Sequence, residues 1–457
     1  MLLKIRLKPR AISELLKRGK LVVTVVGLGY VGGPLAVYLA NLGVKVIGVD
    51  KDVQKVREYR KCKSPIREPG LNELLSKNMK QKRLIFSTDV TEATKKSDVT
   101  MICVGTPVDS QGKPELHGLV SAVEQVGYGL KRGHMVVLRS TVPPGTTEGL
   151  VRDILEKNAG LKAGQDFALA FCPERTVEGR ALKELKEVPH IVGGIDQQST
   201  EIAEAVFRFF GGQVIKVNGC KVAEMAKLLD NIYRYVNVAL ANEVALICEK
   251  LKIDYVESIQ AANVGPRTRM LMPGAGVGGS CLNKDTAMTI YLSRQQNLEP
   301  RILVEARKLN KAMPRRTVML VKDAYNEMGK TIEDSIITIL GLAYKGETDD
   351  LRETVSKPII DDLMSLEAKI RAYDPYVDLN KAKALFTGVT VTKCLRDAVK
   401  KTDCIVIVTD HKEFKELDLK FLKSIANKHA AVVDGRQVFD PSDAVKAGFV
   451  YKGIGRN

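Results

Sequence analysis

The chain has 457 residues, of which 45% are hydrophobic and 27% are charged, with 71 lysines and arginines against 54 aspartates and glutamates. This length exceeds one ordinary core and predicts two or three domains. Eight scattered cysteines without a CxxC pair or a Cys/His cluster argue against a disulfide framework and against a metal site. No apolar run has the length of a membrane span or resembles a signal peptide, so we expect a cytoplasmic protein.

The net charge of +17 is compatible with nucleic acid, an anionic membrane surface or an anionic small substrate. The basic residues are interleaved with acids and form no dense run. Surplus solvated lysine is therefore the simplest explanation and an anionic metabolite the next, so neither nucleic acid nor a membrane is an expected partner. A polyanion-binding protein is the alternative of a different class.

A glycine-rich turn opens the first domain. Residues 1–20 are a basic lead-in that we expect to cap this domain, and residues 21–26 are an aliphatic run typical of a buried strand. The run leads into a GxGxxG motif from Gly27 to Gly32, then a helix to Leu42, and a second strand over residues 44–49 ends at Asp50. This context predicts a dinucleotide site in which Asp50 accepts the ribose hydroxyls of NAD. Lys51 leaves some tolerance of NADP open.

Further strands are expected over residues 99–104, 135–140 and 167–172, which indicates a doubly wound parallel sheet. Polar motifs follow these strands at residues 105–107, 140–145 and 173–176, at the sheet edge where ligands collect. Glu174 in the last motif can act as a general base. Each motif could also be simple turn chemistry.

An uninterrupted helical pattern covers residues 222–251 and places Lys227 and Asn231 four residues apart, on one face. The pair could present a cation and an amide to one oxygen, although a solvated lysine beside a helical asparagine is the simpler interpretation.

One cysteine follows a glycine-rich turn, in the stretch from Gly278 to Asp285. If a helix begins near Ser280, Cys281 lies at its positive end with Lys284 nearby, and both features favour a reactive thiolate. The alternative is a small buried apolar cysteine after a plain turn.

The last part of the chain again alternates strands and helices, with strands expected over residues 336–342, 368–373, 404–408 and 430–433. The turn after the first of these lacks a complete GxGxxG. Its neighbourhood contains Lys345, Arg352 and Arg436, which suit a phosphate-bearing substrate better than a second NAD.

Taken together, the chain resembles the nucleotide-sugar 6-dehydrogenases, the family of UDP-glucose, UDP-N-acetylmannosamine and GDP-mannose dehydrogenases. The matching motifs stand in family order between residues 22 and 440: GLGYVGGPLA, SPIREPGL, CVGTPV, RSTVPPGTT, CPER, AKLLDN, GAGVGGSCLNKD, GLAYKGETDDLRE and DGRQVFD.

The resemblance implies two α/β domains joined by a long central helix, with boundaries at 1–212 for NAD binding, 213–315 for a helical dimerisation region and 316–457 for UDP-sugar binding. It implies oxidation of the sugar C6 alcohol to a carboxylate with two NAD in succession, in a homodimer or higher homo-oligomer. The implied catalytic residues are Cys281, Lys227, Asn231, Glu174, Asp285 and Thr141. The implied cofactor-binding residues are Gly27, Gly29, Tyr30, Val31, Gly32, Asp50, Thr106, Thr141 and Lys284. The implied substrate-binding residues are Glu174, Arg175, Lys227, Arg267, Gly278, Lys345 and Arg436.

In this resemblance Cys281 forms a thiohemiacetal and then a thioester, Lys227 and Asn231 stabilise the oxyanion, and Arg267 reaches the substrate of a neighbouring subunit. Arg175 and the segment from Thr409 to His411 are similar to the N-acetylhexosamine branch, which favours UDP-N-acetylmannosamine or UDP-N-acetylglucosamine. The residues around Cys281 are similar to the glucose branch, so UDP-glucose is the near alternative. An ordinary two-electron dehydrogenase, which needs no cysteine, is a third.

One departure from the family concerns the dinucleotide turn. Gly33 stands where the family often has leucine, which predicts looser packing of the helix that follows.

Overall fold

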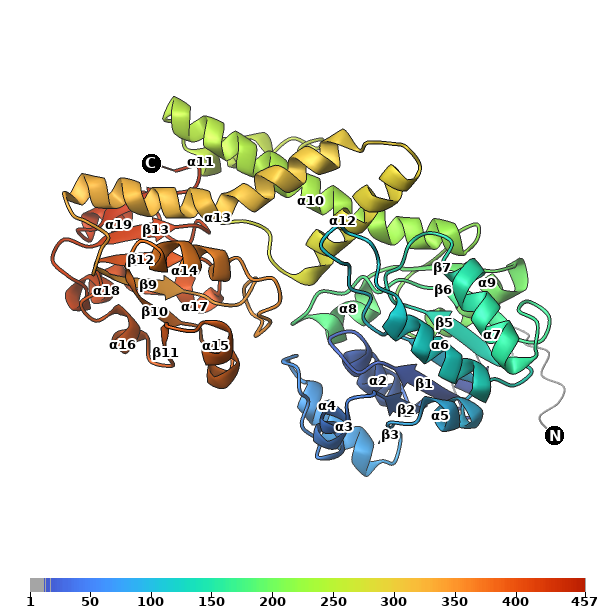
Figure 1. The fold of residues 1–457 in the computed structure, drawn as a ribbon. Coiled ribbons are helices and arrows are strands. Elements are labelled where there is room, and N and C mark those ends of the chain that lie inside the picture. The colour runs from blue at the N-terminus through green and yellow to red at the C-terminus, as the bar shows by residue number, and fades with distance from the viewer. Residues whose placement is uncertain (1–11, 13, 17, 457) are drawn as a thin grey trace. The chain divides into compact units, whose positions relative to one another are not determined.

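The computed structural model describes residues 12, 14–16 and 18–456 (Figure 1). They form two compact units, one of the described residues up to 230 with 287–292 and one of residues 231–286 with 293–456. Most of the lead-in expected over residues 1–20 lies outside the described residues, although Ile12 and Leu16 are buried in the core of the first unit. Within the described residues no helix is both long and apolar enough to cross a membrane.

The first unit is built on an eight-stranded sheet in the order β3-β2-β1-β4-β5-β6-β7-β8. Its strands are β1 (Val22–Val26), β2 (Lys45–Val49), β3 (Leu84–Ser87), β4 (Val99–Ile102), β5 (Met135–Leu138), β6 (Ala168–Phe171), β7 (His190–Gly194) and β8 (Val214–Lys216). The first six are parallel, whereas β7 runs antiparallel to β6. The expected parallel sheet is confirmed. The sequence analysis missed β3, β7 and β8.

In the described part of this unit, helical segments lie between these strands. They are α2 (Gly32–Asn41), α3 (Val53–Arg60), α4 (Leu71–Lys80), α5 (Val90–Lys96), α6 (His117–Gly129), the π-helix η1 (Thr147–Val151), α7 (Arg152–Ala159), α8 (Ala181–Glu187) and α9 (Gln197–Arg208). Strand β1 contributes Val23 and Val25 to one core cluster and Val26 to another, because alternate side chains point to opposite faces. Burial on both faces explains the continuous apolar run that predicted this strand.

The packing expected at Gly33 was wrong, because the space of the missing side chain is filled. A Cβ atom on Gly33 would lie 2.0 Å from the hydroxyl oxygen of Tyr59. The Tyr59 ring, which comes from α3, stacks on Phe86 with centroids 4.9 Å apart. The absent leucine is therefore replaced by a tyrosine from another helix, and the start of α2 is closely packed.

The long helix expected over residues 222–251 is confirmed as α10 (Cys220–Leu251). It is followed by α11 (Tyr255–Ala262), α12 (Ser280–Gln295) and α13 (Arg301–Met328). The expected start of a helix at Ser280 is confirmed, with Gly279 at the N-cap position.

The second unit contains a six-stranded parallel sheet in the order β11-β10-β9-β12-β13-β14. Its strands are β9 (Ile336–Leu340), β10 (Lys369–Tyr373), β11 (Thr390–Thr392), β12 (Cys404–Ile407), β13 (Ala431–Asp434) and β14 (Val450–Gly453). The helices among them are α14 (Ser356–Met364), α15 (Leu379–Leu385), α16 (Leu395–Val399), α17 (Lys412–Lys415), α18 (Leu419–Ile425) and α19 (Pro441–Lys446). Counted from its own first strand, this order is 3-2-1-4-5-6, the order of a dinucleotide-binding fold. The expected second α/β domain is confirmed, with β11 and β14 in addition.

Candidate active site

The glycine-rich turn after β1 has the geometry of a cradle for a phosphate group. Gly27 has a φ of +92°, and a Cβ on Gly32 would lie 1.8 Å from the carbonyl oxygen of Gly27, so neither position has room for a side chain. A Cβ on Gly29, in contrast, would meet nothing within 4 Å. The turn is thus tightly folded on its inner side and open at Gly29, which fits the close approach of a dinucleotide pyrophosphate to the backbone at the start of α2.

Asp50 lies at the end of β2, as expected, and its carboxylate is bound on both sides. Oδ2 accepts the backbone N–H of Leu28 at 2.8 Å and lies 2.9 Å from Nζ of Lys55. Burial raises the pKa of Asp50, but Lys55 and the backbone donors outweigh it, so the pKa lies below its ordinary value. The carboxylate is therefore ionised and can accept hydroxyl protons. The cation beside it is Lys55, whereas Lys51 is exposed.

The polar motifs after β4 and β5 are joined directly. The hydroxyl of Thr106 donates to the carbonyl oxygen of Thr141 at 2.5 Å, and the hydroxyl of Ser140 donates to that of Val104 at 2.7 Å. These bonds bring together two segments that are 35 residues apart in the chain. They support the interpretation that the motifs form one sheet edge.

The third strand-end motif is held by a buried ion pair. Arg139 follows β5, and its Nη2 lies 2.6 Å from Oε2 of Glu174, which follows β6. The other carboxylate oxygen of Glu174 accepts the backbone N–H groups of Arg175 and Thr176. Both oxygens are therefore engaged, so Glu174 is a fixed hydrogen-bond acceptor rather than a loosely held base.

Glu224 connects the motif after β5 to the long helix α10. Its wholly buried carboxylate accepts the backbone N–H groups of Gly145 at 2.5 Å and Thr147 at 2.8 Å, and the Thr147 hydroxyl at 2.6 Å. Burial raises its pKa. Lys227, which is partly exposed, follows one helical turn later. Glu224 thus anchors the helical segment that carries Lys227 to the segment that carries Thr141.

Cys281 is an exposed residue in the first turn of α12. The turn before it is packed by the second unit's own residues. Cβ atoms on Gly278 and Gly279 would lie 2.8 and 2.6 Å from the side chain of Tyr344, and Gly279 donates its N–H to the carbonyl of Glu353. Because Cys281 is exposed, the alternative of a buried cysteine is wrong.

Asp285 is 1% exposed, and both of its oxygens have partners in the second unit. Oδ1 lies 2.5 Å from Nζ of Lys284, and Oδ2 accepts from Nδ2 of Asn231 at 2.5 Å. Lys284 and Asn231 thus meet at one carboxylate. Asn231 retains a second amide hydrogen, which leaves its expected role at an oxyanion chemically available.

The expected substrate-binding residues lie in different settings. In the first unit the guanidinium of Arg175 approaches Asp230 at 3.7 Å and donates to the carbonyl of Pro189. Arg267 is exposed. Lys345 lies over the ring of Tyr344 at 5.7 Å, and Nε of Arg436 donates to the carbonyl of Val408 at 2.7 Å.

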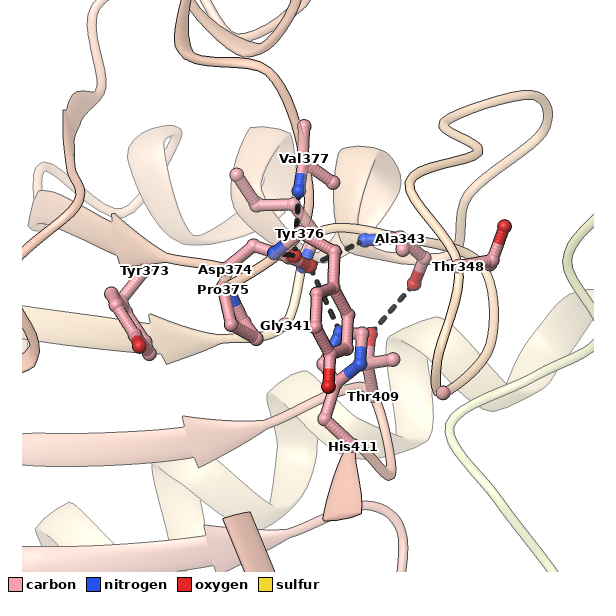
Figure 2. A network of polar contacts seen from close by, with 12 residues as sticks. Gly341, Ala343, Thr348, Tyr373, Asp374, Pro375, Tyr376, Val377, Thr409 and His411 are labelled. Carbon is pink, nitrogen blue, oxygen red and sulfur yellow. Dashed lines mark hydrogen bonds and ion pairs between the residues drawn. The ribbon is translucent and has the colours of Figure 1, made fainter. Parts of the chain in front are cut away.

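The second sheet also has an acid after its second strand, at the position that corresponds to Asp50 of the first sheet, and this acid is buried. Asp374 follows β10 and accepts five donors: the backbone N–H groups of Leu342, Ala343, Tyr376 and Val377, and Nε2 of His411 (Figure 2). A carboxylate so saturated has little capacity left for a ribose. That this sheet suits a phosphate-bearing substrate better than a second NAD stays a prediction.

Comparison with known proteins shows matches along almost the whole described chain. Residues 21–211 match the NAD binding domain of the UDP-glucose/GDP-mannose dehydrogenase family, residues 221–312 its central domain and residues 338–441 its UDP binding domain. The chain belongs to this family. It is an NAD-dependent nucleotide-sugar dehydrogenase, and the resemblance drawn from the sequence is confirmed.

Individual dehydrogenases of the family are similar over their full length. A UDP-N-acetyl-D-mannosamine dehydrogenase of Pyrococcus horikoshii is 36% identical over 435 residues, which cover 95% of this chain and 99% of the relative. The solved structure of UDP-D-ManNAc dehydrogenase from the same organism has a TM-score of 0.87 at 34% identity, covering 95% of this chain and 99% of that one. A UDP-glucose dehydrogenase from Pyrobaculum islandicum has a TM-score of 0.86 at 31% identity, covering 96% and 98%.

Sequence reasoning assigned no positioning role to several residues that hold the candidate residues in place, namely Arg139, Glu224 and Tyr59 in the first unit and Asp374 and His411 in the second. A signal existed for Arg139, because a cation and an acid after neighbouring parallel strands meet at one sheet edge. No comparable signal existed for Glu224 or Tyr59, whose partners are decided by packing.

Proposed function

We propose that this dehydrogenase oxidises the C6 alcohol of a UDP-N-acetylhexosamine to the uronate through a covalent bond to Cys281. The exposed thiol in the first turn of α12 carries this proposal, because a helix N-terminus favours the thiolate. NAD supplies the acceptor for hydride, once for each of the two oxidation steps.

In the first step the alcohol loses a hydride from C6 and a proton, which leaves an aldehyde. The Cys281 thiolate then adds to the carbonyl carbon and forms a thiohemiacetal, whose oxyanion Lys227 and Asn231 stabilise. Loss of the second hydride gives a thioester. Water attacks the thioester, releases the carboxylate and restores the thiol, with Glu174, Thr141 and Asp285 orienting the water and the protons.

The expected cofactor contacts remain part of the proposal. Gly27, Gly29 and Gly32, with Tyr30 and Val31, cradle the pyrophosphate, and Asp50 receives the ribose. Thr106, Thr141 and Lys284 complete the set. On the substrate side, Arg175, Gly278, Lys345 and Arg436 bind the nucleotide sugar, and Arg267 comes from a neighbouring subunit.

The choice of sugar rests on Arg175 and on the relatives. The Pyrococcus protein named for UDP-N-acetyl-D-mannosamine is 36% identical, and proteins named for UDP-glucose also match, at 31–33% identity. UDP-glucose is therefore the second candidate. In this proposal the oxidation of either UDP-sugar to the acid requires Cys281, whereas a two-electron dehydrogenase needs no cysteine.

A substrate panel tests this proposal. The enzyme is incubated with NAD and either UDP-N-acetylmannosamine, UDP-N-acetylglucosamine or UDP-glucose, and NADH is counted against sugar consumed. We expect two NADH per N-acetylhexosamine. NADH formed with UDP-glucose alone would contradict the choice of sugar. With Cys281→Ser we expect formation of the acid to collapse while NAD binding persists, and full acid production by this variant would refute the covalent route.

We infer that the chain is divided at residues 1–212, 213–315 and 316–457, and that the middle region forms a homodimer. Six large apolar side chains are 44–63% exposed at intervals of seven or four residues along α10, which places them on one face: Val222, Leu229, Tyr233, Leu240, Ile247 and Leu251. An exposed apolar stripe of this kind favours burial against a second copy. Light scattering is expected to give a dimer for the native chain and a smaller particle for Leu240→Lys. An unchanged mass for that variant would refute the role of α10.

We also propose that the enzyme is cytoplasmic, as its scattered cysteines suggest. Labelling of intact cells with a membrane-impermeant thiol reagent is expected to leave the exposed Cys394 unmodified until the cells are lysed.

A further inference from the structure

Three consecutive side chains after β12 bind the backbone of one loop. The hydroxyl of Thr409 donates to the carbonyl oxygen of Ala343 at 2.6 Å. Oδ1 of Asp410 accepts the N–H of Gly346 at 3.1 Å, and Nδ1 of His411 accepts the N–H of Glu347 at 3.0 Å. These bonds span 64 to 66 residues of sequence and hold the segment 341–347, which we call the phosphate loop.

The imidazole of His411 is wholly buried, and its two nitrogens have opposite roles. Because Nδ1 accepts a backbone N–H, it carries no proton. The proton is then on Nε2, which donates to Oδ2 of Asp374 at 3.1 Å (Figure 2). Asp374 is itself fixed by four backbone N–H groups, so it orients the ring from behind. The rings of Tyr376 and Phe414 contact the imidazole edge to face.

Close packing at the start of the loop reinforces these bonds. Gly341 has a φ of +95°, and a Cβ there would lie 2.3 Å from Cβ of Thr409. A residue with a side chain would push Thr409 away from the loop. The loop and the segment from Thr409 to His411 therefore fit each other only with glycine at residue 341.

The phosphate loop leads to both groups that the reaction needs from the second unit. Lys345 lies within the loop. The neighbouring residue Tyr344 packs against Gly278 and Gly279. Glu353, beyond the end of the phosphate loop, accepts the N–H of Gly279 at 3.3 Å. Cys281 lies two residues after Gly279. A displacement of the loop would therefore move Lys345 and disturb the support of the turn before Cys281.

We infer that His411 is a positioning residue for the nucleotide part of the substrate, acting through its hydrogen bond to Glu347. The inference deepens the proposed function and rests on the proposed role of Lys345. Asp374 orients the imidazole, the imidazole holds the loop, and the loop places the Lys345 ammonium for the diphosphate. Glu347 itself has a φ of +63°, a conformation that is uncommon for a residue with a side chain and that the hydrogen bond to His411 supports.

Two substitutions at this position separate the two bonds of the ring. In His411→Asn, the amide oxygen takes the place of Nδ1 and can still accept from Glu347, but the bond to Asp374 is lost. In His411→Gln, the amide nitrogen takes the place of Nε2 and can still donate to Asp374, but the bond to Glu347 is lost. A purely structural role predicts similar losses for both, whereas positioning predicts a difference.

The experiment measures UDP binding by calorimetry and the KM for the UDP-sugar by NADH formation. Loss of one neutral hydrogen bond corresponds to about a threefold to tenfold change. We expect His411→Gln to weaken UDP binding and raise KM by this factor, and His411→Asn to remain within about twofold of the native chain. Equal effects of the two variants, or none, would overturn the inference.

Three controls make these outcomes distinct. His134→Gln removes another wholly buried imidazole, bonded to Thr100 in the first unit, and should leave UDP binding unchanged. Lys345→Ala tests the proposed function separately: unchanged UDP binding would refute the role of Lys345 and with it the inference. A tenfold loss with Lys345→Ala and no loss with His411→Gln would refute the inference alone. If His411→Gln does not fold, a comparison of Thr409→Val with Thr409→Ser tests the neighbouring bond to Ala343 instead. Equal UDP affinities of these two variants would overturn the inference that this segment holds the phosphate loop for substrate binding.

Discussion

Nη2 of Arg139 lies 2.6 Å from Oε2 of Glu174, and the side chain of Arg139 has no exposed surface. Burial raises the pKa of Glu174, but the charge of Arg139 and the hydrogen bonds to Thr176 outweigh it, so the pKa lies below its ordinary value. Glu174 is therefore a carboxylate throughout the neutral range. It is suited to accept a hydrogen bond from water or substrate and less suited to exchange a proton near pH 7.

Arg139→Met is expected to shift the acid limb of the pH profile of kcat upward. Without the cation only burial and the backbone donors act on Glu174, so its pKa rises and it becomes protonated at a higher pH. Arg139→Lys should restore part of the native profile. An acid limb that is identical in the native chain and Arg139→Met would show that Glu174 does not titrate in the reaction.

Arg139→Met is also expected to lower the free energy of unfolding by about 3–5 kcal/mol at pH 7, since it leaves the buried charge of Glu174 without its partner. A carboxylate with a depressed pKa in the folded state stabilises the fold above its unfolded pKa and loses that contribution as the pH falls through its folded pKa. The difference from the native chain should therefore shrink in acid. Urea unfolding of the native chain and of Arg139→Met, at pH 7 and in acid, checks this. The control is Arg208→Met, at an exposed pair with Glu204.

Glu224→Gln is expected to destabilise the first unit although it is nearly isosteric. The native carboxylate accepts from Gly145 and twice from Thr147, whereas an amide nitrogen would face one of these N–H groups as a second donor. A buried unsatisfied donor costs about 1–3 kcal/mol. Thermal unfolding measures the loss, and the KM for NAD is expected to rise because the segment around Thr141 is loosened. Full native stability of Glu224→Gln would contradict this account.

Gly33 and Tyr59 are expected to behave as one steric unit. In the native background Gly33→Ala places a methyl group against the Tyr59 hydroxyl, and such overpacking costs about 1–3 kcal/mol. In the background of Tyr59→Leu the same change should cost almost nothing, because the hydroxyl is absent. A double-mutant cycle of unfolding free energies measures the coupling. Gly149→Ala, where a Cβ would meet nothing within 4 Å, is the control. Additive costs would show that the two residues are independent.

Tyr59 also donates its hydroxyl to the carbonyl oxygen of Leu28 at 3.3 Å, while the N–H of Leu28 donates to Asp50. The peptide groups of Leu28, inside the dinucleotide turn, are thus held from both sides. Tyr59→Phe is expected to weaken NAD binding about threefold with kcat unchanged, as for the loss of one neutral hydrogen bond. Tyr325→Phe removes a comparable buried hydroxyl, bonded to Ser335 in the second unit, and should leave NAD binding intact. Equal NAD affinity of Tyr59→Phe and the native chain would exclude this clamp.

Much of the fold was predictable because its central strands are short apolar runs buried on both faces. The runs around Val23 and Ile337 stand out from the polar segments between them. Two of the five missed strands, β8 and β11, differ in this respect, because they have three residues each and contain no buried residue. Edge strands of this kind are defined by hydrogen bonds to a neighbour, so their own composition says little.

The chemistry of the candidate site was also largely local. The recognisable patterns join residues that are close in the chain: a glycine-rich turn after a strand, an acid after the next strand and a cysteine after a second glycine turn. The sequence therefore sufficed for the family and the cofactor, and it singled out Cys281, whose role as the reactive thiol stays a prediction. The tertiary structure alone decided that Glu174 is paired with Arg139, that Tyr59 fills the space at Gly33 and that His411 holds the phosphate loop. These partners are 26 to 64 residues apart, and which side chains meet across such distances depends on strand order and on the space left between packed elements.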